Sequence, residues 1–187
     1  TAGSTLTSQQ PDVNVVRVTL QALAAVMGGT QSLHTNSRDE ALGLPTAEAA
    51  LLALRTQQVI AEESGVTATI DPLGGAPFVE ALTDKVEAEA LELIAEIDRR
   101  GGALAAVEQG FQQREIHQVA YEHQRAVDDG SRRIVGVNCY AEGEDVRPPI
   151  LHVDDSLGEQ RAAAMKAWRG QRDHARWSAA METLVAA

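Results

Sequence analysis

A run of small polar residues at 30–36 is the part of the chain best suited to hold a polar ligand. It includes Gln31, Ser32 and His34, which all donate or accept hydrogen bonds without carrying a fixed charge. Such groups near a buried strand require a polar ligand or ordered water, because burying them without a hydrogen-bond partner costs free energy. Taken alone, His34 has a simpler interpretation, in which a backbone carbonyl satisfies its ring.

Acidic residues and glycine pairs follow in places where ligands are often held. Asp39 and Glu40 come just after the polar run, and a carboxylate pair there is ordinarily typical of a helix start. Asp71 precedes a proline at the end of a predicted strand, where it either points into a site or caps the loop. The glycine pairs at 28–29 and 74–75 lack the spacing of a nucleotide-binding loop, so they predict helix ends and turns.

The remaining reactive residues do not predict a metal or nucleophile site. His117 and His123 lack the i, i+4 spacing of helical metal ligands, and no His, Cys, Asp or Glu cluster has such a spacing. Cys139 has no nearby histidine or helix N-terminus to activate its thiol, so we interpret it as a small core residue. Trp168 and Trp177 predict packing of the C-terminal tail on a partner surface.

The composition predicts an acidic globular protein. Its 187 residues carry 16 basic and 27 acidic side chains, a net charge of −11, which argues against binding to nucleic acid. A single cysteine excludes an internal disulfide and fits a reducing compartment. The sequence holds no stretch of about 20 apolar residues and no signal peptide at its start, so we expect a cytoplasmic protein without a membrane partner.

Helices are predicted over most of the chain from apolar residues at helical spacing. The first helix runs from Pro11 to a stop at the glycine pair 28–29, with Val16 and Leu20 on its apolar face. The clearest helix spans 79–100, with acidic residues opposite an apolar face that includes Leu82 and Val86. Further helices are predicted at 51–63, 104–109, 115–127 and within 156–187.

Three short segments, at 30–36, 66–70 and 134–138, are predicted to be strands because they combine apolar and β-favouring residues. Helices of 10–20 residues between such strands indicate a parallel α/β fold. A complete (β/α)₈ TIM barrel takes about 250 residues. The sequence therefore predicts part of a barrel, followed by a charged linker at 142–149 and a helical C-terminal extension.

Several motifs follow one another along residues 1–140. They are Asn14-Val15-Val16-Arg17, Gly28-Gly29-Thr30-Gln31-Ser32-Leu33-His34-Thr35-Asn36, Asp39-Glu40-Ala41-Leu42, Leu44-Pro45-Thr46, Thr56-Gln57, Glu62-Glu63-Ser64-Gly65, Asp71-Pro72-Leu73-Gly74-Gly75 and Ile134-Val135-Gly136-Val137-Asn138. Their order and spacing resemble the large subunit of the adenosylcobalamin-dependent acyl-CoA mutases, the methylmalonyl-CoA mutase family. The tail resembles the C-terminal extension of members whose cobalamin domain is a separate chain.

This resemblance implies a radical isomerase that rearranges the carbon skeleton of a CoA thioester. It implies that residues 1–140 form the C-terminal portion of the family's barrel, and that 141–187 form the linker and tail. Gln31, His34 and Glu40 are then expected to face adenosylcobalamin, with Glu40 hydrogen-bonded to the adenosyl ribose, and Ser32 to face the acyl-CoA substrate. The implied partners are the rest of the barrel, a small cobalamin-binding subunit that holds most of the cofactor, and a GTPase chaperone.

The chain departs from the family pattern in two respects. The family residues that hold the substrate carboxylate lie before the matched region, and the Asp-x-His-x-x-Gly motif that binds cobalt is absent, since Asp173 and His174 are adjacent. We therefore expect no catalytic residue and no metal ligand in this segment, and no turnover by the chain alone. The alternatives are a non-catalytic assembly module that docks a subunit or chaperone, and another CoA-using barrel.

Overall fold

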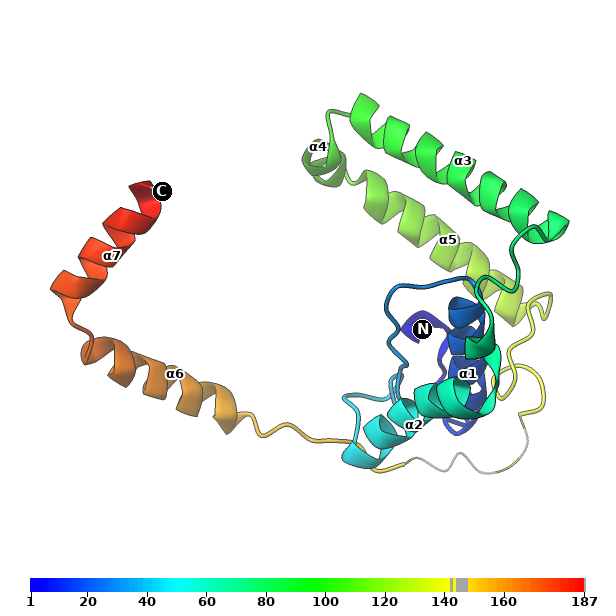
Figure 1. Cartoon of the computed structure of the whole chain (residues 1–187), viewed down its shortest axis with the longest axis horizontal. Coiled ribbons are helices and arrows are strands. Elements are labelled where there is room, and N and C mark those ends of the chain that lie inside the picture. The colour runs from blue at the N-terminus through cyan, green and yellow to red at the C-terminus, as the bar shows by residue number, and fades with distance from the viewer. Residues whose placement is uncertain (142, 144–147, 187) are drawn as a thin grey trace. The chain divides into compact units, whose positions relative to one another are not determined.

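The computed structural model describes residues 1–141, 143 and 148–186, and the described chain is helical (Figure 1). It divides into two compact units, Thr1–Leu151 and His152–Ala187. None of the described helices is both long and apolar enough to cross a membrane. The helices are α1 (Val13–Met27), α2 (Ala47–Glu63), α3 (Pro77–Arg99), α4 (Ala103–Glu108), α5 (Phe111–Asp128), α6 (Ser156–Gly170) and α7 (His174–Ala186), with short 3₁₀ turns η1 (Gly3–Thr5) and η2 (Val66–Ala68).

The predicted helices are confirmed, and local signals explain their ends. Gly28 caps the end of α1, and Gly29 follows at a φ of 76°, a conformation that glycine adopts without strain. Thr46 caps the start of α2, and its hydroxyl accepts a hydrogen bond from the N–H of Ala49 at 3.2 Å. Helix α3 has Pro77 in its first turn, where a missing N–H is harmless.

The prediction of an α/β fold with TIM-barrel strands is wrong for this structure. Within the described residues, the only β pairing is an isolated bridge between Val135 and Cys139. A parallel strand satisfies its backbone groups through neighbouring strands, and none of the three predicted segments lies beside another as a ladder. Residues 66–68 instead form η2, and residues 134–138 fold into a turn that the Asn138 side chain closes. The β-favouring residues therefore follow their local context rather than their propensity.

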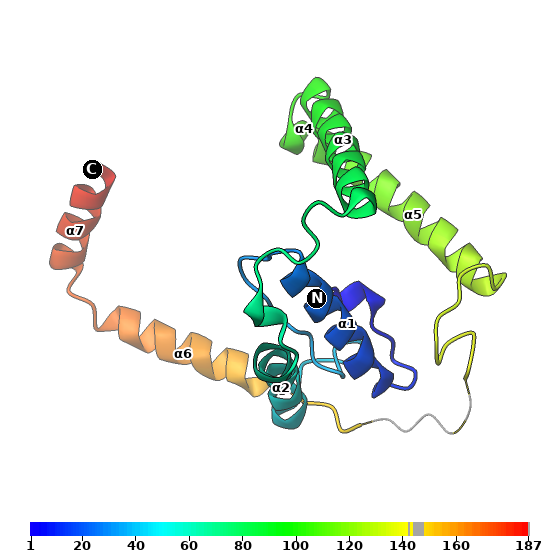
Figure 2. The same ribbon diagram turned by 45° about the vertical axis from the view of Figure 1, so that its right-hand side comes forward.

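Helices α1 and α2 pack together and form most of the core (Figure 2). The buried face of α1 is not the predicted one, because Val16 and Leu20 are exposed whereas Asn14, Val18 and Ala22 are buried. Small residues on both helices allow a close approach. The buried side chains of α2 are Ala49, Ala53, Thr56 and Ile60.

Replacing Val18 with alanine is expected to lower the free energy of unfolding by about 2 kcal/mol, because it removes methyl groups from a fully packed site. Val18 is 2% exposed. Leu20→Ala is the matched control on the same helix, where the side chain is 63% exposed and we expect a change below about 0.5 kcal/mol. Urea unfolding followed by circular dichroism measures both, and equal losses would contradict the described packing of α1.

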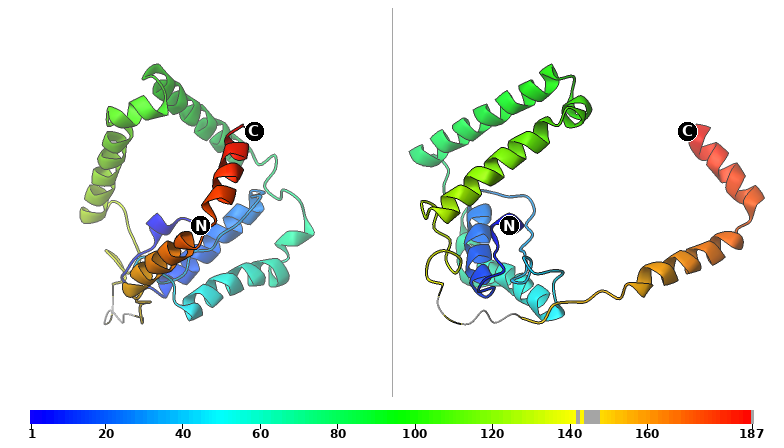
Figure 3. Two further views of the ribbon diagram at one scale, coloured as in Figure 1. Left: turned by 90° about the vertical axis from the view of Figure 1, so that its left-hand side faces the viewer. Right: turned by 180° about the vertical axis from the view of Figure 1, so that it is seen from behind.

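Helices α3 and α5 form an open hairpin through α4 (Figure 3). None of the side chains of α3 is buried, and the apolar residues Leu82, Val86 and Leu93 are each about half exposed. Ordered packing is concentrated at the α4–α5 junction, where the Arg100 guanidinium lies 4.2 Å from the centre of the buried Phe111 ring. The α3 helix thus presents an apolar face to solvent.

The unit His152–Ala187 consists of α6 and α7. The Arg172 guanidinium lies 5.1 Å from the Trp168 ring and 5.2 Å from the Trp177 ring, at distances typical of cation–π contacts. Both tryptophans remain exposed. Most of the linker predicted at 142–149 lies outside the described residues, and the division of the chain at residue 140 stays a prediction.

Candidate functional site

The segment that connects α1 and α2 lies against α2 and is held by side-chain hydrogen bonds. Thr35 is buried, and its hydroxyl donates a hydrogen bond to the carbonyl of Ala53 at 2.8 Å. The Gln57 amide donates to the Thr35 hydroxyl at 3.0 Å and to the Leu33 carbonyl at 3.3 Å. These side-chain hydrogen bonds hold the segment in place of the backbone hydrogen bonds that a neighbouring strand would form in a sheet.

Asn14 of α1 fixes the same connection from the other side, with its side chain completely buried. Its amide nitrogen donates to the carbonyls of Thr7 and Arg38, each at 2.9 Å, and its amide oxygen accepts from the Thr7 N–H at 3.1 Å. The Arg17 guanidinium also donates to that oxygen at 2.7 Å. One amide therefore joins the N-terminal segment, α1 and the segment that carries the candidate residues.

Asp39 links this segment to the start of α2. Its Oδ2 accepts hydrogen bonds from the N–H of Thr46 at 3.0 Å and from the Thr46 hydroxyl at 3.3 Å. Burial alone would raise the pKa of the Asp39 carboxyl, but the Ser37 hydroxyl and the donors of Thr46 lower it below its ordinary value. Asp39 therefore acts at a helix start, the ordinary interpretation of the acidic pair.

Two buried polar atoms, one of Ser37 and one of Asp39, lack hydrogen-bond partners in the described residues. Ser37 Oγ and Asp39 Oδ1 are buried, and neither reaches hydrogen-bond geometry with another atom in the described residues. The Ser37 hydroxyl is nonetheless close enough to favour the charged carboxylate. Buried polar atoms without partners are uncommon and indicate a place for water or a ligand group.

The pH dependence of stability tests the role of Asp39. Its folded-state pKa is lowered, so the carboxylate stabilises the fold above its ordinary pKa of about 4, and this stabilisation is lost as the pH falls through the folded-state pKa. We expect Asp39→Asn to lower the free energy of unfolding by about 1–2 kcal/mol at pH 7, and the difference from wild type to shrink below about pH 4. Asp84→Asn on exposed α3 is the control, for which we expect a change below about 0.5 kcal/mol at pH 7. A pH-independent deficit in Asp39→Asn would contradict this role.

A pocket of about 220 Å³ opens between the connecting segment and α2. His34 and Glu40 both line it, so the structure brings together two of the predicted site residues. Gln57 also lines it, and its position was missed although it falls on one helical face with Ala50, Ala53 and Leu54. The remaining lining residues are Thr35, Ser37 and Pro45.

Comparison with known proteins identifies the family. The family model described as "Methylmalonyl-CoA mutase" matches residues 1–187. The chain belongs to the methylmalonyl-CoA mutase family. It is 47% identical over its whole length to the 2-hydroxyisobutanoyl-CoA mutase large subunit of Aquincola tertiaricarbonis, of which it covers 33%. It is 43% identical over 186 residues, 99% of its length, to the methylmalonyl-CoA mutase of Escherichia coli (strain K12), of which it covers 26%.

A mammalian relative gives the same result. The mitochondrial methylmalonyl-CoA mutase of Homo sapiens is 44% identical over 176 residues, which are 94% of this chain and 24% of that protein. The chain thus spans about a quarter to a third of the length of these curated relatives. The resemblance drawn from the polar run and its neighbouring motifs is confirmed.

The other predicted residues of this mutase-family segment lie apart from the pocket. Gln31 and Ser32 precede it in the connecting segment, and both are exposed and absent from its lining. The His34 ring makes no hydrogen bond to any described residue, so the simpler interpretation of this histidine is not realised here. Asp71 has a φ of 48° and accepts from the N–H of Gly74 at its carbonyl, as expected for a turn.

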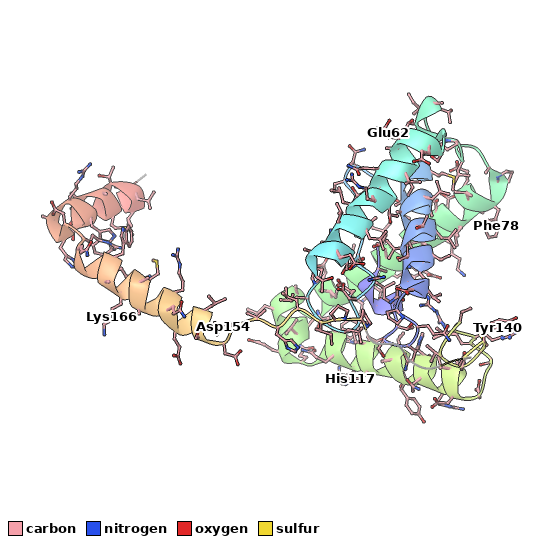
Figure 4. All side chains as sticks on the ribbon, turned by 90° about the horizontal axis from the view of Figure 1, so that it is seen from below. Glu62, Phe78, His117, Tyr140, Asp154 and Lys166 are labelled. Carbon is pink, nitrogen blue, oxygen red and sulfur yellow. The ribbon has the colours of Figure 1, made fainter. Side chains whose placement is uncertain are left out.

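The structure also gives the positions of the residues that the sequence predicts to be unreactive. Cys139 is half-buried and free. His117 lies on exposed α5, where it is labelled in Figure 4. Across the described residues, no group of His, Cys, Asp and Glu is arranged to hold a metal ion.

Proposed function

We propose that this chain is a segment of the large subunit of an adenosylcobalamin-dependent acyl-CoA mutase, an isomerase that rearranges the carbon skeleton of a CoA thioester. The observation that carries the proposal is the match over all 187 residues to a 2-hydroxyisobutanoyl-CoA mutase large subunit at 47% identity. Since the chain covers a third of that protein, its role is to contribute binding contacts rather than the complete reaction.

The pocket at His34 and Glu40 suits the nucleoside end of the cofactor. Its volume of about 220 Å³ is too small for a corrin ring but accommodates a sugar or base. Glu40 supplies a carboxylate for ribose hydroxyls, and Leu54 with Pro45 supplies an apolar wall for a base. Ser37 also lines the pocket, and its hydroxyl is a further polar group there.

Within this proposal, Glu40, His34 and Gln31 orient the cofactor, and Ser32 contacts the acyl-CoA. Adenosylcobalamin supplies the radical chemistry when it is bound, and the protein supplies orientation and exclusion of water. The corrin ring is then held mainly by a small cobalamin-binding subunit. A GTPase chaperone is a further proposed partner.

Exposed apolar faces support the need for the rest of the large subunit. Val16 and Leu20 on α1 are 59% and 63% exposed, and Leu82 and Val86 on α3 are 48% and 56% exposed. Amphipathic helices ordinarily bury such faces. We therefore propose that the remainder of the subunit covers them and closes the pocket.

Glu40→Ala tests the proposed cofactor contact in the assembled enzyme. We expect the KM for adenosylcobalamin to rise about tenfold, corresponding to the loss of one charge-assisted hydrogen bond, with little change in the KM for acyl-CoA. Glu62→Ala is the matched control, because Glu62 is exposed near the other end of α2 (Figure 4). An unchanged KM for adenosylcobalamin in Glu40→Ala would remove Glu40 from the site.

A second candidate function is a non-catalytic assembly module, and the exposed apolar face of α3 favours it. Such a module would dock a partner subunit or chaperone through α3 without contributing to the reaction. Steady-state kinetics distinguishes the two candidates. A module tolerates Glu40→Ala without a change in cofactor use, whereas a mutase segment does not.

A further inference from the structure

A second cavity, of about 340 Å³, is lined by basic and neutral residues. Its charged side chains are Arg17 of α1 and Arg132 and Arg133, which follow α5, and His123 of α5 lies beside them. None of its described lining residues is a carboxylate, in a chain whose net charge is −11. The other lining residues are Ser4, Thr5, Leu6, Thr7, Ile134 and Val135.

Arg17 is a half-buried cation that is bonded to neutral groups. Its guanidinium donates to the Thr7 hydroxyl at 3.0 Å, to the Asn14 amide oxygen at 2.7 Å and to the Val135 carbonyl at 2.5 Å. No carboxylate in the described residues forms an ion pair with it. Burial lowers the pKa of Arg17, as expected for a charge that is removed from water without a counter-charge.

Backbone hydrogen bonds position Arg132 at the cavity, and a ring contact positions the side chain of Arg133. The N–H of Arg132 donates to the Ala126 carbonyl at 2.7 Å, and the Arg132 carbonyl accepts from the Asn138 amide at 2.7 Å. The Arg133 guanidinium lies 5.5 Å from the centre of the Tyr140 ring, which is labelled in Figure 4. The nearby Asp129 carboxylate accepts a hydrogen bond from the Ser131 N–H at 2.9 Å and does not line the cavity.

We propose that this cavity binds a phosphate group, as a diphosphate or a phosphate ester. Guanidinium groups match the geometry of phosphate oxygens and form paired charge-assisted hydrogen bonds with them. The hydroxyls of Ser4 and Thr5 add uncharged donors. A doubly charged ligand compensates the three arginines better than a single carboxylate does.

The phosphate comes from one of two sources. It belongs to the CoA portion of the substrate, in which case the inference rests on the proposed function, or it is a free phosphate compound. The cavity and the pocket at His34 and Glu40 have no lining residue in common. Binding of inorganic pyrophosphate can therefore be measured without any isomerase activity.

Calorimetric titration of the 187-residue chain with pyrophosphate tests the proposal. We expect saturable binding to the wild type, weakened by about tenfold or more in the Arg132→Gln/Arg133→Gln double variant. The control is Arg161→Gln/Arg169→Gln on α6, which removes the same charge elsewhere and should change the affinity by less than about twofold. Circular dichroism verifies that both variants keep the helical fold.

Two results would overturn the proposal: no saturable binding of pyrophosphate up to about 10 mM, or an equal loss of affinity in both double variants. A second titration with CoA distinguishes the sources. CoA binding that is lost with Arg132→Gln/Arg133→Gln assigns the phosphate to CoA. CoA binding that does not depend on these arginines, together with pyrophosphate binding that does, assigns the cavity to a free phosphate compound.

Discussion

Replacing Asn14 with alanine is expected to lower the free energy of unfolding by about 3 kcal/mol, the largest stability effect of any single substitution considered for this chain. The side chain is completely buried and bonded to Thr7, Arg17 and Arg38. Truncation leaves two backbone carbonyls, an N–H and a half-buried guanidinium without this partner. Each such group then bears its desolvation penalty without a compensating bond.

Urea unfolding monitored by circular dichroism measures this effect. Gln118→Ala is the matched control, because Gln118 is an exposed amide on α5 that donates its side-chain hydrogen bond to the exposed Glu122. We expect a change of about 0.5 kcal/mol or less for this control. A loss below about 1 kcal/mol in Asn14→Ala would contradict the structural role assigned to the buried amide.

The helices could be predicted because their signals are local. The glycine pair after α1, Thr46 before α2 and Pro77 at the start of α3 each mark a boundary through their own backbone or side-chain chemistry. The buried face of α1 could not be predicted from local signals in the same way. Asn14 is buried because it bonds to distant backbone groups, and no periodicity of apolar residues reveals that requirement.

The strands could not be predicted reliably, since a strand depends on partners far away in the sequence. Residues 30–36 form an irregular segment, in which Thr35 is hydrogen-bonded to Ala53 and Gln57 of α2 rather than to a second strand. The pairing of His34 with Glu40 at one pocket followed from their closeness in sequence. Gln57 was missed because its closeness to them arises from the packing of α2.

Joining this chain to the rest of a mutase is expected to produce cobalamin-dependent turnover, the largest functional effect that we predict. The chain covers 33% of the length of the 2-hydroxyisobutanoyl-CoA mutase large subunit, and its pocket is too small for a corrin ring. We therefore expect no isomerisation by the chain alone. Placed in the Aquincola tertiaricarbonis large subunit in exchange for the matching third, it should restore turnover at least about 100-fold above background.

The most direct test is to measure conversion of 2-hydroxyisobutanoyl-CoA by this chimeric large subunit combined with a cobalamin-binding small subunit, with and without adenosylcobalamin. We predict isomerisation only when all components are present, and a specific loss of cofactor affinity in the chimera that carries Glu40→Ala. A folded and assembled chimera without activity, or turnover that persists without adenosylcobalamin, would contradict the assignment of this chain to a functional mutase subunit.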